Sequence, residues 1–278
     1  MKKVLIIGGG LAGCTVAKEL SAAGIESCIV ETGASIGGKA RGYGCKSDTK
    51  CNNCGLCAVG TLWRDVEGDM RVKKLCNARV IDISDAGGVF CVLIQSDGGK
   101  IEERFTDIVV ATGFEYPAET AGAGYDASEF PRVFTGHALE KLMKDRGADS
   151  IFPEAPKSVA FLMCYGSRNL KERAPYCSRV CCAYSTRAAK VIKHYYPDAE
   201  VIAFYMDLQA VNPGNYAAEL EGRGIRLERC RPADISFDGG RPVIAYEDAE
   251  GRKTKSFDYL FLNTGIHPDI PGNTALAD

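Results

Sequence analysis

Apolar residues occur in short runs that alternate with longer amphipathic stretches along this chain of 278 residues. The run VLII at 4–7 leads into glycines, an amphipathic helix pattern and a second apolar run, SCIV. The run KSVAFLM at 157–163 is likewise followed by a helix pattern and by EVIAFYMD, which ends at Asp207. Strands that alternate with helices are typical of parallel sheets, so the pattern predicts an α/β fold with two β-α-β units.

Other runs predict the elements around these units. ARVIDIS at 78–84 and GVFCVLIQS at 88–96 alternate apolar and polar residues and are joined at glycines, which is typical of hairpin strands. The segment 133–147 predicts a helix capped by Thr135. Two further apolar runs, TDIVV and FDYLFLN, predict buried strands.

A glycine-rich turn follows the first predicted strand. Gly8, Gly10 and Gly13 fit the pattern G-x-G-x-x-G. In that pattern the first glycine permits a tight turn, the second lets the backbone approach a pyrophosphate, and the third lets the helix pack closely on the strand. Free N–H groups at the helix start then face the phosphates. Glu31 ends the second strand, where a carboxylate can accept hydrogen bonds from ribose hydroxyls. The sequence therefore predicts a dinucleotide-binding unit.

The charge balance and the hydropathy limit the kinds of partner. The net charge is −2 and the isoelectric point is about 6.0, so no global basic field favours nucleic acid. No apolar run approaches the roughly 20 residues that span a bilayer. The start, MKKVLIIGGG, loosely resembles a signal peptide, but it continues directly into a strand, turn and helix pattern. We therefore expect a cytoplasmic protein without a membrane span.

Cysteine is abundant, with 13 residues. In a reducing cytoplasm, clustered cysteines indicate metal or redox chemistry rather than disulfides. Eight cysteines fall into two groups, and five lie singly in apolar or strand-like surroundings, where we expect buried small side chains. The five single cysteines are Cys14, Cys28, Cys76, Cys91 and Cys230.

The segment CYGSRNLKERAPYCSRVCC at 164–182 spaces four cysteines as C-x12-C-x3-C-C. Disulfides, zinc, a redox pair or an iron–sulfur cluster could each explain such a group. Adjacent cysteines suit zinc poorly, because zinc ligands usually come as two C-x2–4-C pairs. A [4Fe-4S] cluster needs four thiolates, and Cys181 and Cys182 lie near the start of a predicted helix, whose dipole favours anions. Three arginines either offset the charge of a cluster or are ordinary exposed residues: Arg168, Arg173 and Arg179.

Three more markers resemble the two-dinucleotide-binding flavoprotein families. Gly37-Gly38 follows the acid, Ala111-Thr112-Gly113 resembles the ATG motif that closes the FAD domain, and Thr264-Gly265 ends another apolar strand. The predicted hairpins match the small β-meander that precedes ATG in such folds. The resemblance implies FAD rather than a free nicotinamide cofactor. The FAD-binding residues that we expect are Gly8, Gly10, Leu11, Ala12, Gly13, Glu31, Gly38, Lys39, Val80, Ala111, Thr112, Gly113, Thr264 and Gly265.

The second β-α-β unit departs from the pyridine nucleotide-disulfide oxidoreductases, where a second G-x-G-x-x-G binds NAD(P)H. Here Cys164-Tyr165-Gly166-Ser167-Arg168 and a long insertion replace that turn. Without the second and third glycines the backbone is badly placed for a pyrophosphate. We therefore expect no direct NAD(P)H binding.

The same segment, with the following AYSTRAAKVIK and FYMDLQA, resembles the A-type flavoprotein of heterodisulfide reductase. It also resembles related flavoprotein subunits, including those of the quinone-interacting membrane-bound oxidoreductase. The resemblance implies that one [4Fe-4S] cluster is ligated near the flavin by Cys164, Cys177, Cys181 and Cys182. It further implies an oligomeric electron-transfer protein that exchanges electrons with partner subunits, in a family with electron-bifurcating members.

The second cysteine group, in GYGCKSDTKCNNCGLCAVG at 42–60, reads C-x5-C-x2-C-x2-C. C-x2-C-x2-C is the core of the ferredoxin run, but the usual distant cysteine before proline is missing, and Cys45 or Cys76 could substitute for it. Zinc, or a thiol pair that exchanges with the flavin, are alternatives. The expected ligands of a possible second [4Fe-4S] cluster are Cys45, Cys51, Cys54 and Cys57.

We thus expect two Rossmann-like units similar to thioredoxin and glutathione reductases. The expected segments are an FAD domain at 1–118 with a cysteine-rich insertion at 42–60 and a β-meander at 79–105, a linker and helix at 119–154, a second Rossmann-like domain with the iron–sulfur site at 155–254, and a return to the FAD domain at 255–278. The usual last strand with its Gly-Asp motif does not follow TGIHPD, so we expect an FAD domain truncated at its C-terminus.

Two other functions stay open at this point. One is an NAD(P)H-dependent flavin disulfide reductase, and the other is a zinc-stabilised scaffold without enzymatic activity. No Ser-His-Asp set or carboxylate pair is visible, so we expect the cofactors to perform the chemistry.

Overall fold

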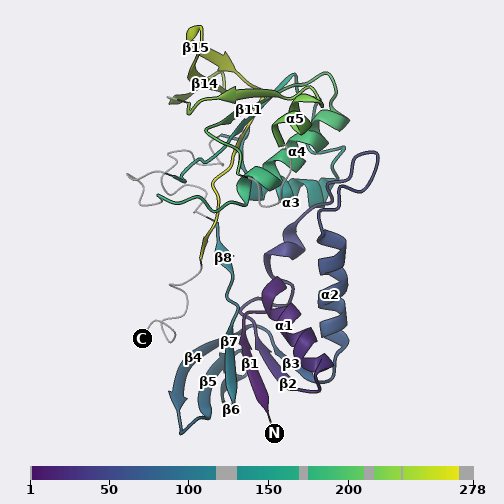
Figure 1. Cartoon of the computed structure of the whole chain (residues 1–278), viewed down its shortest axis with the longest axis vertical. Coiled ribbons are helices and arrows are strands. Elements are labelled where there is room, and N and C mark those ends of the chain that lie inside the picture. Colours follow the sequence, from purple (N-terminus) through teal and green to yellow (C-terminus); the bar gives the residue numbers. More distant parts are fainter. Residues whose placement is uncertain (1, 117–129, 169–174, 210–215, 233, 269–278) are drawn as a thin grey trace. The chain divides into compact units, whose positions relative to one another are not determined.

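The computed structural model describes residues 2–116, 130–168, 175–209, 216–232 and 234–268 (Figure 1). The chain forms two compact units. The first unit contains the residues up to Tyr43 together with Gly55–Glu115, and the second contains Gly44–Cys54 and Tyr116–His267. Among the described residues, no helix is both long and apolar enough to cross a membrane.

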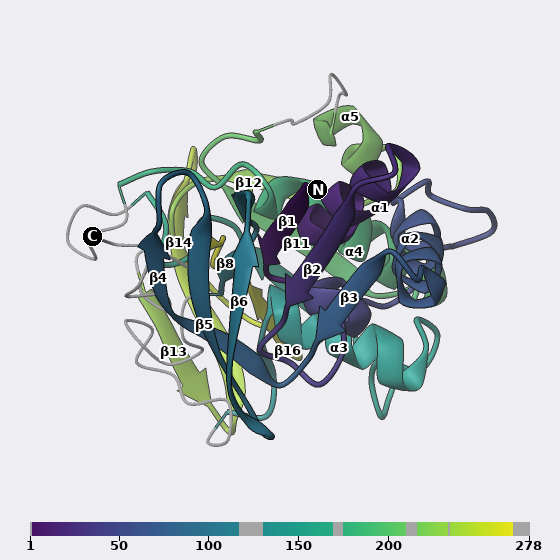
Figure 2. The same ribbon diagram turned by 90° about the horizontal axis from the view of Figure 1, so that it is seen from below.

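The first unit is built on a four-stranded parallel sheet in the order β3-β2-β1-β7. Its helices lie on one face and an antiparallel three-stranded sheet, β4-β5-β6, on the other (Figure 2). The strands are β1 (Lys3–Ile7), β2 (Glu26–Val30), β3 (Val72–Leu75), β4 (Ala78–Asp85), β5 (Phe90–Ser96), β6 (Gly99–Phe105) and β7 (Asp107–Val110). The helices are α1 (Leu11–Ala22), the 3-10 helix η1 (Gly38–Gly42) and α2 (Leu56–Gly68).

Strand β1 shows why this unit has three layers. Successive side chains of a strand point to opposite faces. Leu5 and Ile7 pack in a core with β4, β5 and β6, whereas Val4 and Ile6 pack in a core with α1 and α2. A strand covered on both faces must be apolar throughout, which explains the continuous run VLII.

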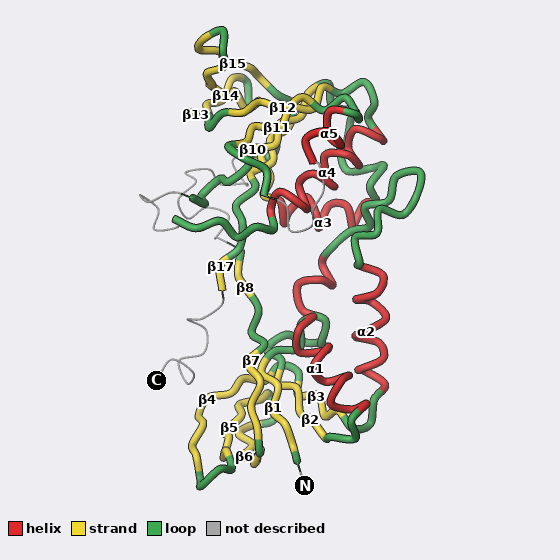
Figure 3. Tube along the Cα trace, in the orientation of Figure 1, coloured by secondary structure: helices red, strands yellow, loops and turns green. Residues whose placement is uncertain are grey.

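The second unit has a five-stranded parallel sheet in the order β12-β11-β10-β16-β9. Helices lie on one side of it and the antiparallel sheet β13-β14-β15 on the other (Figure 3). The strands are β9 (Val133–Thr135), β10 (Ser158–Leu162), β11 (Glu200–Tyr205), β12 (Arg226–Arg229), β13 (Asp234–Asp238), β14 (Arg241–Asp248), β15 (Gly251–Ser256) and β16 (Tyr259–Leu262). The helices are α3 (Gly136–Arg146), α4 (Cys181–Tyr195) and α5 (Tyr216–Glu221), and a short pair is formed by β8 (Phe114–Glu115) and β17 (His267–Pro268).

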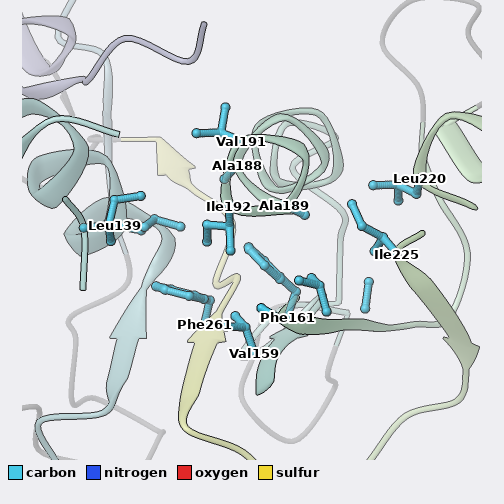
Figure 4. Close-up of a cluster of buried hydrophobic side chains, with 14 of the residues drawn as sticks. Leu139, Val159, Phe161, Ala188, Ala189, Val191, Ile192, Leu220, Ile225 and Phe261 are labelled. Carbon is cyan, nitrogen blue, oxygen red and sulfur yellow. The ribbon is translucent and has the colours of Figure 1, made fainter. Parts of the chain in front are cut away.

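Strand β10 repeats the pattern of β1. Val159 and Phe161 pack against the helices together with Ile192 (Figure 4), whereas Ala160 and Leu162 pack against the antiparallel sheet. The order β12-β11-β10-β16 therefore matches β3-β2-β1-β7 strand for strand. The turn after β10 is consequently the topological counterpart of the glycine turn after β1, and the end of β11 is the counterpart of the end of β2.

The predicted α/β fold with two Rossmann-like units is confirmed, and so are the hairpins β4-β5 and the helix α3 capped by Thr135, whose hydroxyl accepts a hydrogen bond from Ala138 N. The segment boundaries are different from those expected. Strand β16, expected in a return to the first domain, pairs with β10 inside the second sheet. Residues 44–54 and helix α3 also belong to the second unit. Part of the expected linker, residues 117–129, lies outside the described residues.

Candidate functional site

The glycine turn after β1 is shaped by close backbone contacts. Gly8 has a φ of +102°, and a Cβ on it would lie 2.3 Å from the carbonyl oxygen of Ala111. A Cβ on Gly13 would lie 2.0 Å from the carbonyl oxygen of Gly8. At Gly10, by contrast, a Cβ would meet no atom within 4 Å. The turn thus packs tightly on the protein side at Gly8 and Gly13 and is open at Gly10, where a pyrophosphate would approach.

Glu31 lies beside this turn. Its carboxylate accepts hydrogen bonds from the backbone N–H groups of Gly9 and Gly33, each at 2.7 Å, one on each oxygen. Each carboxylate oxygen has two acceptor positions, so both can accept a further hydrogen bond from a ribose hydroxyl. Gly38 packs on the turn as well, since a Cβ there would lie 2.9 Å from the Cα of Gly10. The chemistry of this cradle fits a dinucleotide.

A cavity of about 70 Å³ adjoins the turn and brings together Gly8, Glu31, Val80 and Thr112, all of which were expected to contact FAD. Arg79 and Thr32 also line it. Both residues continue into a neighbouring open pocket of about 720 Å³. The sequence analysis missed Arg79 and Thr32, although their positions directly before Val80 and directly after Glu31 could have indicated them.

The remaining expected FAD contacts lie around this cradle or outside it. Leu11 and Ala12 are exposed in the first turn of α1, and Ala111, Thr112 and Gly113 follow β7. The ammonium of Lys39 forms an ion pair with Glu115 at 2.9 Å. Thr264 and Gly265 follow β16 and belong to the second unit.

The turn after β10 carries the four cysteines of the first group. Cys164 lies after the strand, Cys181 and Cys182 open α4, and these three thiols are buried. The thiol of Cys181 lies within hydrogen-bonding reach of both Cys164 and Cys182. Cys177 is partly buried and its sulfur accepts a hydrogen bond from Arg179 N at 3.3 Å. The structure thus brings three of the four expected ligands together.

These thiols contact one another rather than surround a common point. Accordingly, the described part of the chain contains no group of three or more His, Cys, Asp or Glu side chains arranged to hold a metal ion. The donor set nevertheless fits an iron–sulfur cluster in chemistry, because it consists of buried thiols with N–H donors beside them. The hydrogen bond from Cys181, together with that from Arg168, lowers the pKa of Cys164 to about 7 although burial opposes this change.

The cysteine turn is also strained. Among the described residues other than glycine and asparagine, a positive φ occurs at Cys164 (58°), Arg168 (55°) and Arg179 (60°), and all three belong to this turn. Such conformations cost free energy and cluster at functional sites. Of the three arginines expected to offset a cluster, Arg168 and Arg179 thus have defined places in the turn, and Arg173 lies outside the described residues.

Thr264 and Gly265 contact this turn. The hydroxyl of Ser167 donates to the carbonyl oxygen of Thr264 at 2.7 Å. A Cβ on Gly265 would lie 2.7 Å from the Ser167 hydroxyl and 2.9 Å from that of Ser178. Buried Asn263 joins strand and helix, because its side chain accepts a hydrogen bond from Ser185 at 2.5 Å and donates to Leu162 O. The end of β16 therefore stabilises the cysteine turn, as Ala111 packs against Gly8 in the first unit.

The second cysteine group is divided between the units. Cys45, Cys51 and Cys54 belong to the second unit, and Cys57 lies in α2 of the first. The segment 44–54 is anchored to α3 by a buried ion pair at 2.5 Å between Lys46 and Glu140, whose side chains are 7% and 9% exposed. A second ion pair joins Asp48 to Arg223 at 3.0 Å.

The chain has relatives among proteins of known name. Residues 6–59 match the family model of the NAD(P)-binding Rossmann-like domain. The chain is 25% identical over 355 residues to the A-type component of the ferredoxin/F(420)H(2)-dependent CoB-CoM heterodisulfide reductase of Methanosarcina acetivorans, covering 96% of this chain and 44% of the relative. It is 36% identical over 181 residues to the A-type component of the H(2):CoB-CoM heterodisulfide,ferredoxin reductase of Methanothermobacter thermautotrophicus, covering 61% of this chain and 28% of the relative.

The chain is a homologue of the A-type component of heterodisulfide reductase. It spans about 44% of the length of the first two of these curated relatives. Among solved structures, it is similar to the thioredoxin reductases of T. acidophilum and of Lactococcus lactis. The TM-scores are 0.60 and 0.61 at 16% and 15% identity, covering 97% and 96% of this chain and 79% and 78% of those chains. These structures agree with the fold derived above.

Proposed function

We propose that this chain is a flavin-dependent oxidoreductase, namely the FAD- and [4Fe-4S]-dependent electron-transfer part of a heterodisulfide reductase-like complex. When bound, FAD supplies two-electron redox chemistry and the cluster one-electron transfer. The observation that carries the proposal is the convergence of Cys164, Cys181 and Cys182 in the turn where a nicotinamide-binding unit has its glycines.

In the first unit, the residues around the glycine turn would hold FAD. The N–H groups at the start of α1 would bind its pyrophosphate, and Glu31 would orient its ribose. Gly8, Val80 and Thr112 line the cavity beside Glu31, where the adenosine would lie. In the second unit, Cys164, Cys177, Cys181 and Cys182 would ligate the cluster and exclude a nicotinamide from the same turn.

The finer parts of this function are proposals as well. Partner electron-transfer subunits would donate or accept electrons, in a cytoplasmic oligomeric complex, as the names of the relatives suggest for those proteins. Electron bifurcation would require such partners. A second [4Fe-4S] cluster would use Cys45, Cys51, Cys54 and Cys57 as its ligands.

The test is metal and flavin analysis after anaerobic purification, with absorbance spectra. We expect one FAD and four irons per chain, or eight if the second group is loaded, with broad absorbance near 400 nm. We also expect reduction by dithionite but not by NADH. Zinc without iron would instead support a scaffold, and rapid flavin reduction by NADH alone would support a flavin disulfide reductase; either result would contradict the proposal.

A further inference from the structure

Asp207 occupies the position in the second unit that Glu31 occupies in the first. Glu31 follows β2 directly, and Asp207 lies two residues after β11, the counterpart of β2. An acid at this place binds a ribose in dinucleotide-binding units. Asp207 has other partners, however: one oxygen accepts a hydrogen bond from the guanidinium of Arg168, and the other accepts one from the side-chain amide of Gln209.

Both partners of Asp207 also contact the cysteines. The guanidinium of Arg168 hydrogen-bonds to the thiol of Cys164 and so bridges this sulfur and Asp207. The backbone N–H of Gln209 donates to the thiol of Cys182. The segment after β11 therefore supplies hydrogen bonds to the cysteine site at two points, instead of facing a ribose.

The conformation of Arg168 supports a built arrangement. Its φ of 55° is unfavourable for an arginine, and its backbone N–H donates to Tyr176 O at 3.3 Å within the cysteine turn. Its side chain is 30% exposed and that of Asp207 is 39% exposed, so neither charge is deeply buried. An ion pair this exposed contributes little to stability, which leaves the orientation of Arg168 toward Cys164 as its main consequence.

We propose that Asp207 is a positioning residue that holds Arg168 against Cys164 and thereby raises the reduction potential of the cluster at these cysteines. The inference rests on the proposed function, since it assumes a cluster on this ligand set. Hydrogen bonds to ligand sulfurs and nearby positive charge stabilise the reduced form, because reduction adds one electron. No bond in the protein forms or breaks in this reduction.

The sign of one substitution separates positioning from simple charge. Removing the negative charge of Asp207 by Asp207→Asn would by itself make reduction easier and raise the potential. If Asp207 instead acts by holding Arg168, Asp207→Asn releases the guanidinium and lowers the potential. Arg168→Gln should lower it as well, by about tenfold in the reduction equilibrium, which is ~59 mV. Adding Asp207→Asn to Arg168→Gln should then produce no further decrease.

The experiment is a potentiometric titration of the anaerobically purified chain with dithionite, followed by EPR, after iron analysis of each variant. The matched control is Arg229→Gln, an exposed arginine that donates to Met206 O at 3.1 Å, and its potential should stay at the wild-type value. A raised or unchanged potential in Asp207→Asn would overturn the inference while leaving the proposed function intact. A wild-type chain without iron would overturn both. If Asp207→Asn does not retain iron, Arg168→Lys replaces it, and a wild-type potential there would overturn the inference, because lysine keeps the charge but cannot bridge both groups.

Discussion

Gly10 and Gly13 lie in the same turn, but the space around them is different. A methyl group on Gly13 would collide with the Gly8 carbonyl at 2.0 Å, whereas one on Gly10 would meet nothing within 4 Å. Gly13→Ala should therefore lower the free energy of unfolding by about 1–3 kcal/mol. Gly10→Ala should change it by less than ~1 kcal/mol but weaken FAD binding, because the methyl group enters the space left for the pyrophosphate. Urea unfolding and flavin titration measure the two effects; equal stability losses in both variants would contradict this account.

Glu103 on β6 predicts a pH effect on the first unit. Burial alone would raise its pKa, but hydrogen bonds from Lys3 and Lys73 outweigh burial and lower it below 4.5. A lowered folded pKa means that the unfolded chain binds the proton more readily. The stabilisation is therefore complete above pH 4.5 and is lost as the pH falls through the folded pKa.

Glu103→Gln should accordingly cost about 1 kcal/mol at neutral pH and less in acid. The control is Glu102→Gln, on the exposed face of the same strand. The measurement is the free energy of unfolding as a function of pH. An equal effect of Glu103→Gln in neutral and in strongly acidic solution would show that charge is not the cause.

At the scale of elements, the segment 44–54 is held to α3 by the buried pair Lys46–Glu140. Removing one partner of a buried ion pair strands the other charge and costs roughly 3–5 kcal/mol, whereas replacing both by apolar residues is often neutral. Lys46→Met should therefore destabilise the second unit strongly, and Lys46→Met combined with Glu140→Leu should recover most of the loss. Thermal unfolding tests this. A double variant as unstable as the single one would mean that the ion pair itself is required.

Sequence patterns predicted the elements better than their grouping. VLII and SVAFL indicated buried strands because both faces of each are covered, and the glycine spacing indicated the turn after β1. The run YLFL also indicated a strand, but β16 was assigned to the wrong unit. Its Thr264-Gly265 ending looks like Thr112-Gly113 because β16 and β7 are topological counterparts, and an apolar strand does not specify its neighbour.

At the scale of the whole molecule, two units of one topology carry different turns after their first strands. The first turn is open at Gly10, and the second contains buried thiols held by Ser167, Asn263 and Ser185. The cysteine spacing predicted a shared site, but the partners from distant strands could not be predicted, since no local pattern links position 167 to 264. The same limitation hid Asp207 and Arg168, which are 39 residues apart.

The central claim is that the second unit holds an iron–sulfur cluster in this turn. The most direct measurement is the iron content of the anaerobically purified Cys181→Ser variant, compared with the wild type and with Cys14→Ser, a buried cysteine of the first unit. The account predicts the loss of about four irons per chain in Cys181→Ser, with FAD retained, and no loss in Cys14→Ser. Wild-type iron content in Cys181→Ser, or a wild type without iron, would contradict it.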